Sequence, residues 1–462
     1  MKNYIQYYII LILIALTMTA ISCENFLELD DPKNQISQTT VFRNKETATA
    51  ALTDVYTNLR SKGILTGDTS GMNYLLGCYT DELTSVTAQQ TDFRTFYELS
   101  IQPNNLAVRS LWTNAYQQIY AVNNIIEGVQ ENSSYLDSAT VNQLLGEAFF
   151  IRALLHFYLV NLYDQIPYVQ STNYIINQNI PKKSVPEVYN LLIQDLLSSE
   201  SKLGNSYPGT GRTRANKSTA QLLLSRAYLY QNNWALAKDY ALKVIANPDY
   251  SVVQNLDMAF LKDSKSAVLQ FMPVEVAANT LEGQYFIFQT LPPPNAVLSS
   301  SFMSSFENGD LRKLKWTKEV SNGQSTFYHP YKYKQNNKTA ASVEYTIVFR
   351  IEEAYLILAE AENEMGNSAQ AKIYLNVMRS KAGLQGDSSS SQTQLRLAIL
   401  NERQHELFTE FGHRFFDLKR KDLLDQKILP LKSNWKTYFR NLPLPEQELL
   451  INQNLKPQNE GY

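Results

Sequence analysis

Apolar residues recur every three or four positions over long stretches of this chain. Between residues 44 and 61 the recurring positions are Ala48, Ala51, Leu52, Val55 and Leu59. Between residues 108 and 129 they are Leu111, Ala115, Ile119, Val122 and Ile126. Such spacing places the apolar side chains on one face of a helix. The sequence therefore predicts an amphipathic helix in each segment.

Two further segments carry different helical signals. The segment 144–167, "LLGEAFFIRALLHFYLVNLYDQIP", is apolar on almost every side, which predicts a buried helix that ends before Pro167. The segment 185–204 has Pro186 near its start and Gly204 at its end, as helices commonly do. The body of the chain is therefore predicted to be mainly helical.

Two stretches of the chain can be aligned with each other. Arg226 to Ile245 and Glu360 to Arg379 match at a constant offset. The matched pairs are Ala227 with Ala361, Asn233 with Asn367, Ala237 with Ala371, Lys238 with Lys372, and Tyr240 with Tyr374. Each stretch reads as a helix, a turn containing Asn and a second helix, as in a tetratricopeptide repeat. We expect an all-α scaffold of such hairpins, with long inserted loops and a few short strands.

Two regions, about 62–105 and 272–345, break the helical pattern. Both are rich in Gly, Ser, Thr, Asn and Pro, and both also carry many aromatic residues. Unstructured linkers lack aromatic residues, whereas long ordered loops on a rigid scaffold often carry function. These two regions are the predicted ligand-binding loops.

Composition narrows the possible partners. The 462 residues are 44% hydrophobic and 19% charged, enough to bury a core, and the net charge is -2. No run rich in Lys and Arg stands out, which argues against a nucleic-acid partner. The chain holds 29 Tyr and 20 Phe, and most of these must pack the interior.

The N-terminal segment predicts export. An apolar run from Ile9 to Ile21 follows Lys2 and ends in small residues, as a signal peptide does. "AISC", residues 20–23, resembles a bacterial lipobox, in which Cys23 would be acylated; the alternative is a chance cysteine near an ordinary cleavage site. The predicted organisation is a signal peptide over 1–22, a lipidated tether over 23–45 and a helical domain over 46–462. Cys78 would then have no disulfide partner.

Signals for catalysis or metal binding are weak. Of the four histidines, His405 begins a partial metalloprotease motif, but the second histidine is missing because residue 409 is Thr. No nucleophile elbow, phosphate-binding loop or dinucleotide fingerprint is present. We expect no catalytic residue, no metal and no cofactor.

Several acidic residues lie close together on predicted helices. The carboxylate pairs are Glu352 with Glu353, Glu360 with Glu362, and Glu402 with Glu406. They could serve a glycosidase, but beside basic residues they favour ion-paired helix faces. In the segment 401–420 we expect local pairs of Arg403 with Glu406, and of Asp417 with Arg420 or Lys421.

Six stretches in order resemble the SusD/RagB-like outer-membrane lipoproteins of Bacteroidetes. They cover 111–126, 146–169, 214–245, 349–384, 400–420 and 442–462. The second, "GEAFFIRALLHFYLVNLYDQIPYV", resembles the family's series of Glu-Ala, Arg-Ala, Phe-Tyr, Leu-Tyr and Pro. The last ends in "NEGY", similar to the family's closing Asn-x-Gly-Tyr. The resemblance spans nearly the whole chain after the leader.

The resemblance implies a location, a partner and a ligand. It implies a lipid-anchored binding protein without enzymatic activity, exposed on the outer membrane. The implied partner is a SusC-like TonB-dependent transporter, over which the protein acts as a lid. The usual ligands are oligosaccharides, and some members take peptides.

Sugar recognition needs flat aromatic faces together with polar groups that bind hydroxyls. The candidates chosen from the two loop regions are Asp81, Arg94, Phe96, Tyr97, Trp316, Tyr328 and Tyr331. Asp81 and Arg94 stand where this loop resembles starch-binding relatives. Trp112 and Trp234 lie in helical motifs and are expected in the core.

Three alternatives to glycan capture stay open at this point. One is capture of peptides by the same architecture. The second is a helical glycoside hydrolase that uses one of the carboxylate pairs. The third is a surface protein with a purely structural role.

Overall fold

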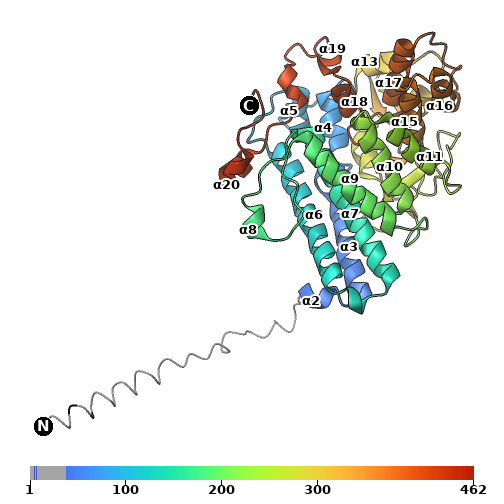
Figure 1. Cartoon of the computed structure of the whole chain (residues 1–462). Helices are drawn as coiled ribbons and strands as arrows, with labels where there is room; N and C mark the ends of the chain where they lie inside the picture. The colour runs from blue at the N-terminus through green and yellow to red at the C-terminus, as the bar shows by residue number, and fades with distance from the viewer. Residues whose placement is uncertain (1–4, 6, 8–37) are drawn as a thin grey trace.

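Helices are the main element of the computed structural model, which describes residues 5, 7 and 38–462 (Figure 1). The longer helices are α3 (Lys45–Ser61), α6 (Leu106–Glu131), α7 (Ser138–Tyr163), α9 (Val185–Lys202), α10 (Lys217–Tyr230), α11 (Trp234–Ile245), α15 (Ile351–Glu364), α16 (Ser368–Lys381), α17 (Gln392–Leu407) and α18 (His413–Arg420). The expectation of a mainly helical scaffold is confirmed.

Shorter helices occupy the connections between the long ones. The short α-helices are α2 (Gln38–Val41), α4 (Met72–Tyr79), α5 (Asp92–Tyr97), α8 (Tyr174–Asn177), α12 (Leu281–Phe286), α13 (Ser300–Ser305), α14 (Leu311–Lys315), α19 (Leu424–Ile428) and α20 (Glu446–Ile451). The 3₁₀ turns are η2 (Gly63–Leu65), η3 (Ser133–Tyr135), η4 (Thr437–Arg440) and η5 (Gln453–Leu455).

The two aligned repeats are helical hairpins, as predicted. They correspond to α10–α11 and α15–α16, and α11 packs directly on α15 although more than a hundred residues separate them. The four matched alanines, Ala227, Ala237, Ala361 and Ala371, are fully buried. Small side chains let the helices of each hairpin approach closely. Asn233 and Asn367 both stand at the N-cap of the second helix, and the Asn233 side chain accepts a hydrogen bond from the Leu236 N–H. The region 246–350 is therefore inserted between stacked hairpins.

Helix α7 is the buried helix expected from its apolar sequence. It packs between α6 and α9, and the three lie side by side in Figure 1. Within the described residues, it is the helix long and apolar enough to cross a membrane, yet most of it is buried inside the protein. Asp164, with φ of 69°, ends it three residues before Pro167. This helix is thus the central element of the core.

The folded domain begins slightly before the expected boundary at residue 46. Phe42 is buried, and Arg43 donates a hydrogen bond to the side chain of Asn132 at 3.2 Å. The Phe42 ring lies against Gly128 of α6, where an added Cβ would come within 2.0 Å of it. Residues from at least Phe42 onward therefore belong to the helical domain and not to a tether.

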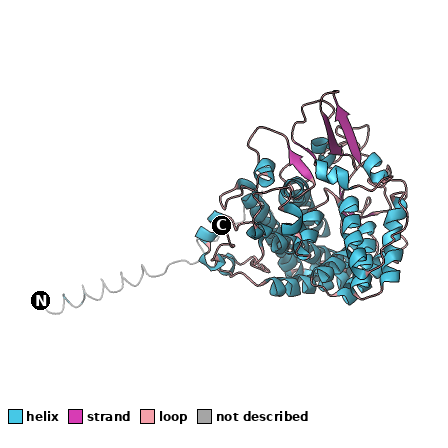
Figure 2. Ribbon diagram, turned by 90° about the horizontal axis from the view of Figure 1, so that it is seen from above, coloured by secondary structure: helices cyan, strands magenta, loops and turns pink. Residues whose placement is uncertain are grey.

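Strands are few and short, as expected. They are β1 (Leu83–Ser85), β2 (Ala267–Phe271), β3 (Ala296–Leu298), β4 (Thr317–Ser321), β5 (Thr326–Pro330) and β6 (Thr346–Arg350). They form antiparallel pairs of β1 with β3, β2 with β6 and β4 with β5. The β4–β5 hairpin projects from the helical body (Figure 2). Its turn holds Asn322 and Gly323, and Gly323 adopts a φ of +85° that suits glycine.

The two predicted loop regions contain more regular structure than their composition indicated. Region 62–105 includes α4, which is buried along its whole length and holds the free Cys78. Region 272–345 includes α12 to α14 and the β4–β5 hairpin. Many aromatic residues of both regions therefore pack the core.

Buried ion pairs connect the helices to one another. Arg152 of α7 pairs with Asp195 of α9 at 2.6 Å, and Arg226 of α10 pairs with Glu353 of α15 at 2.6 Å. Both pairs are bidentate, which matches the planar guanidinium to the carboxylate. Breaking such a pair leaves one charge buried without compensation.

The expected local pairs in segment 401–420 are correct in part. Asp417 pairs with Arg420 at 2.7 Å, as predicted, but Arg403 pairs with Asp417 at 2.7 Å and not with Glu406. Glu406 is instead bound by cations from other parts of the chain. The reason is that α17 is buried on several sides, so its charges find tertiary partners.

Replacing Arg226 with Met is expected to lower the free energy of unfolding by about 3–5 kcal/mol, because Glu353 would stay buried without a cation. The double variant R226M/E353Q should recover part of this loss. Denaturation in urea measures both effects. Lys243→Met, whose side chain is 48% exposed and pairs with Glu200, is the control and should cost less than about 1 kcal/mol. An Arg226→Met loss no larger than the control's would contradict the assignment.

Candidate functional site

The two predicted loop regions meet through strand pairing. Leu83 pairs with Leu298 and Ser85 with Ala296, and the Val86 N–H donates to the Asn295 carbonyl at 3.1 Å. The strand β5 of the projecting hairpin packs against β3. Segments more than two hundred residues apart thus form one small surface beside the hairpin.

A hollow of about 450 Å³ lies over this surface. Its walls come from β1, β3, α13, α14 and β5, and they combine aromatic, aliphatic and hydroxyl side chains with one lysine. The lining residues are Thr84, Val86, Val297, Leu298, Ser300, Met303, Ser304, Lys313, Thr326, Phe327 and Tyr328. Pockets of about 300–1,000 Å³ are the size that holds small ligands. We refer to this site as the hairpin hollow.

The aromatic wall of the hairpin hollow is held in place by the hairpin itself. Phe327 and Tyr328 are half-buried, so part of each side chain remains accessible. Glu319 stands opposite Tyr328 in the strand register, and its carboxylate accepts a hydrogen bond from the Tyr328 hydroxyl at 2.7 Å. The wall can therefore offer an apolar ring face, while nearby hydroxyls and Lys313 can form hydrogen bonds.

Tyr328 is the one sequence-derived candidate that lines the hairpin hollow. Asp81 lies before β1, where its carboxylate receives two hydrogen bonds from Arg414, at 2.9 and 2.6 Å. This ion pair fixes the start of β1 against α18. Asp81 thus supports the site and is largely covered, with a side chain 9% exposed.

Three other candidates are partly accessible but lie outside the hairpin hollow. Arg94 binds Glu98 at 2.7 Å and the Thr87 carbonyl at 2.6 Å, so it braces the loop after β1. The ammonium group of Lys432 lies 4.5 Å from the centre of the Tyr97 ring, and that of Lys334 lies 4.2 Å from the Tyr331 ring. These three side chains therefore have partners within the protein.

Phe96 and Trp316 are corrections to the sequence-derived set. Phe96 is fully buried and packs edge-on against Tyr79 at 5.6 Å between ring centres. Trp316 is fully buried, and its indole N–H donates to the Leu256 carbonyl at 3.0 Å. Neither ring is accessible to a ligand, because both regions fold into the core. Trp112 is buried as expected, whereas Trp234 is partly exposed at the start of α11.

The sequence reasoning missed most residues of the hairpin hollow. Phe327 stands directly before Tyr328, and Lys313 and Met303 come from short helices that carry no strong periodic signal. The Asn322–Gly323 pair, a common signal of a tight hairpin turn, could have indicated the hairpin and therefore Phe327. The contribution of β1 could not have been found, because it depends on pairing across the chain.

The acidic pairs considered for catalysis are bound by cations. Glu353 pairs with Arg226, Glu360 with Arg420 at 2.5 Å, and Glu402 with Arg312 at 2.6 Å. This confirms the ion-paired interpretation of these carboxylates. Among the described residues, no group of three or more His, Cys, Asp and Glu could hold a metal ion.

Comparison with known proteins agrees with this architecture. A family model described as "Starch-binding associating with outer membrane" matches residues 25–229, and one described as "SusD family" matches residues 299–460. The chain belongs to the SusD/RagB-like family. SusD-like proteins form a carbohydrate-binding family associated with the outer membrane and its transporters in Bacteroidetes, so the resemblance seen in the sequence is confirmed.

Full-length SusD-like relatives support the assignment. SusD-like protein P25 of Formosa agariphila is 24% identical to this chain, and the match covers 98% of this chain and 99% of P25. SusD-like protein P2 of the same organism is 26% identical, and the match covers the full length of both chains, 100% of each. A SusD superfamily structure from Bacteroides vulgatus has a TM-score of 0.78 at 20% identity, and covers 92% of this chain and 100% of its own. A "Laminarin binding SusD-like protein" has a TM-score of 0.76 at 22% identity, covering 91% and 100%. The shared fold extends over almost the whole chain.

Next to Asp81, this SusD-like chain buries a second carboxyl group. Glu82 is 3% exposed, and one of its oxygens has no hydrogen-bond partner. Burial, with a smaller contribution from Asp81, raises the pKa of Glu82 to about 8, although Arg414, the Thr409 N–H and Lys332 act in the opposite direction. Glu82 is therefore protonated in the folded protein at neutral pH.

Glu82 should make stability depend on pH. The unfolded carboxyl titrates near 4.5, so the stability it contributes is complete below pH 4.5 and is lost as pH rises to about 8. Glu82→Gln does not titrate, so its unfolding free energy should rise relative to the natural protein between pH 5 and 8, by up to about 1.4 kcal/mol per pH unit. Urea denaturation at four pH values measures this, and a constant difference would contradict the assignment.

Proposed function

We propose that this protein captures oligosaccharides at the hairpin hollow and has no enzymatic activity. The observation that carries the proposal is the partly exposed aromatic wall of Phe327 and Tyr328 beside hydroxyl groups and Lys313. Ring faces pack against the C–H faces of sugars, and hydroxyls and ammonium groups bond the sugar hydroxyls. A structural neighbour named as laminarin-binding supports a glycan over a peptide.

The hairpin hollow is suited to binding and release. Its ring wall is braced by the bond between Tyr328 and Glu319, so little ordering is needed when a ligand arrives. It lies beside the β4–β5 hairpin, which projects from the helical body (Figure 2). We propose that the captured oligosaccharide passes to a SusC-like TonB-dependent transporter, with this protein as its lid.

We propose that the protein acts at the cell surface and is anchored to the outer membrane through acylated Cys23. That residue lies outside the described part of the structure, so its support is the sequence "AISC" after an apolar run. A single acyl chain gives only weak, reversible membrane binding. Several acyl chains on Cys23 would therefore give stable attachment. The acidic residues that follow, Glu24 to Asp31, fit a signal for surface export.

Tyr328→Ala is expected to weaken oligosaccharide binding by roughly tenfold, because the ring face would be lost. Phe327→Ala should act in the same direction. Calorimetric titration with laminarin-type and starch-type oligosaccharides, and with a panel of other glycans, measures the effect. Tyr174→Ala, which removes a ring that is 72% exposed on α8, is the matched control and should leave binding unchanged.

Two results would overturn this part of the proposal. One is saturable binding of peptides without binding of any glycan in the panel. The other is release of reducing sugar from a polysaccharide that stops when a carboxylate pair is replaced. Glycan binding that is insensitive to both aromatic variants would place the site elsewhere.

Cys23→Ala should release the protein from the membrane fraction, because the acyl acceptor is lost. Fractionation followed by detection with an antibody measures the distribution. The matched control is Cys78→Ala, which alters the other of the two cysteines and should stay in the membrane fraction. Retention of the Cys23→Ala protein in membranes would rule out the anchor.

A further inference from the structure

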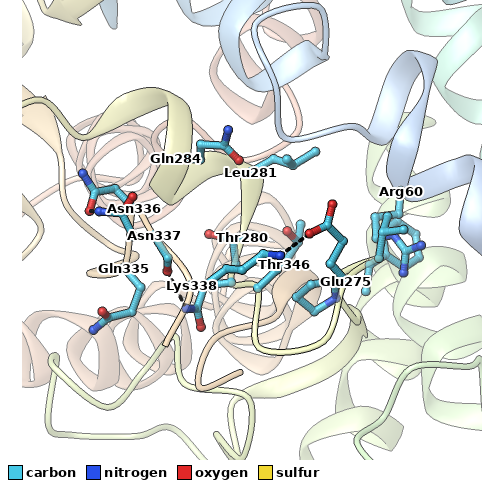
Figure 3. A pocket seen from close by; sticks show the side chains of 15 residues that line it. Arg60, Glu275, Thr280, Leu281, Gln284, Gln335, Asn336, Asn337, Lys338 and Thr346 are labelled. Carbon is cyan, nitrogen blue, oxygen red and sulfur yellow. Dashed lines mark hydrogen bonds and ion pairs between the residues drawn. The ribbon is translucent and has the colours of Figure 1, made fainter. Parts of the chain in front are cut away.

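A second hollow, of about 400 Å³, lies apart from the hairpin hollow and shares no residue with it (Figure 3). It is bounded by the end of α3, the loop after β2, helix α12 and the loop 335–338. Charged and polar side chains line much of it, among them Arg60, Glu275, Asn279, Gln335, Asn337 and Lys338. We refer to it as the Arg60 pocket.

The two loops of the Arg60 pocket are joined by hydrogen bonds. The Asn279 side-chain amide donates to the Asn337 carbonyl and to the Thr339 hydroxyl, both at 3.0 Å, and its oxygen accepts from the Val343 N–H at 2.9 Å. The Thr339 N–H donates to the Ala277 carbonyl at 3.0 Å. The walls are therefore held in position before any ligand binds, which lowers the cost of binding.

Arg60 brings a positive charge to this pocket without a carboxylate partner. Its guanidinium is half-buried and donates to the Met272 carbonyl, but its Nε–H is buried and has no hydrogen-bond partner. No acidic side chain in the described part of the chain forms an ion pair with Arg60. Protein atoms cover that Nε–H, so a ligand would meet the accessible part of the guanidinium. A half-buried cation without an ion-pair partner attracts an anion, and a carboxylate matches guanidinium geometry best.

A second cation stands at the mouth of the pocket. Lys338 forms an ion pair with Glu275 across the two loops, drawn as a dashed line in Figure 3. Their side chains are 61% and 64% exposed, so solvent screens the pair and it contributes little stability. A ligand carboxylate could therefore displace Glu275 from Lys338 at small cost.

The remaining polar groups of the Arg60 pocket differ from those of the hairpin hollow. The one aromatic ring in its lining, Phe271, is 3% exposed and offers no stacking face. The carboxamides of Gln284, Gln335, Asn336 and Asn337 predominate instead, because that of Asn279 is already occupied in joining the two loops. Each amide carries both donors and an acceptor, as a ligand with several hydroxyl groups requires.

We propose that the Arg60 pocket binds the carboxylate of an acidic saccharide, a uronate residue, with Arg60 as its main partner. Lys338 assists once Glu275 is displaced, and the carboxamides bond the sugar hydroxyls. The saccharide nature of the ligand rests on the proposed function, whereas the requirement for a carboxylate rests on Arg60 alone. The protein would thus select glycans by charge at one site and by ring faces at the other.

The test compares uronate trisaccharides of the galacturonate and mannuronate series with their methyl esters, which have the same rings without the charge. Calorimetric titration of the purified protein should show at least one acid binding on the order of tenfold more tightly than its ester. Arg60→Met should abolish this difference, and Glu275→Gln should increase the affinity for the acid. Arg440→Met, which lines no part of the pocket, is the control and should change nothing.

The possible results separate this inference from the proposed function. Three results would overturn the inference: equal binding of acid and ester, no binding of either, or a preference for the acid that survives Arg60→Met. The proposed function would still stand if the binding of neutral glycans depended on Tyr328. An Ala-Ala-Val tripeptide that binds through its carboxylate in an Arg60-dependent way, with no uronate binding, would overturn the assignment to saccharides. Loss of the acid preference in Tyr328→Ala, with Arg60→Met unaffected, would place the carboxylate site at the hairpin instead.

Discussion

The buried carboxylate of Glu406 is the charge on which the packing of this protein depends. Arg312, Arg350 and Lys381 all reach it, at 3.1, 2.5 and 2.7 Å, and all four side chains are buried. A carboxylate taken out of water is costly unless cations and hydrogen bonds surround it. The chain must therefore bring α14, β6, α16 and α17 together at one point.

This charge cluster also holds the loops that form the hairpin hollow. Lys332, just after β5, donates hydrogen bonds to the Glu406 and Phe408 carbonyls, each at 2.8 Å. Trp316 lies just before β4, and the ammonium groups of Lys332 and Lys381 are about 5 Å from the centre of its ring. The base of the hairpin is thereby fixed to the helical scaffold. Trp316, which is fully buried, therefore supports the base of the hairpin by packing. The hairpin tip, in contrast, is exposed and free to meet a ligand.

The helices were largely predictable because their apolar faces repeat with helical spacing. Leu52, Leu111 and Leu154 are buried as their patterns require, and the matched alanines of the hairpins are buried at their contacts. The loop candidates were less predictable. Tyr328 and Trp316 both stand in the predicted loop region 272–345, yet one lines a hollow and the other is fully buried. Residue type could not separate them, because burial in an insertion depends on what packs over it.

The helical scaffold, the hairpin repeats, the family and the case for export could all be inferred from the amino-acid sequence. They depend on local periodicity and on motifs that are contiguous in the chain. Which side chains meet in a hollow depends instead on how distant segments pack. The hairpin hollow needs β1 beside β3 and β5, and the unpaired charge of Arg60 is visible only once the loops around it are placed. Both features rest on contacts between residues far apart in the chain, and no local pattern encodes such contacts.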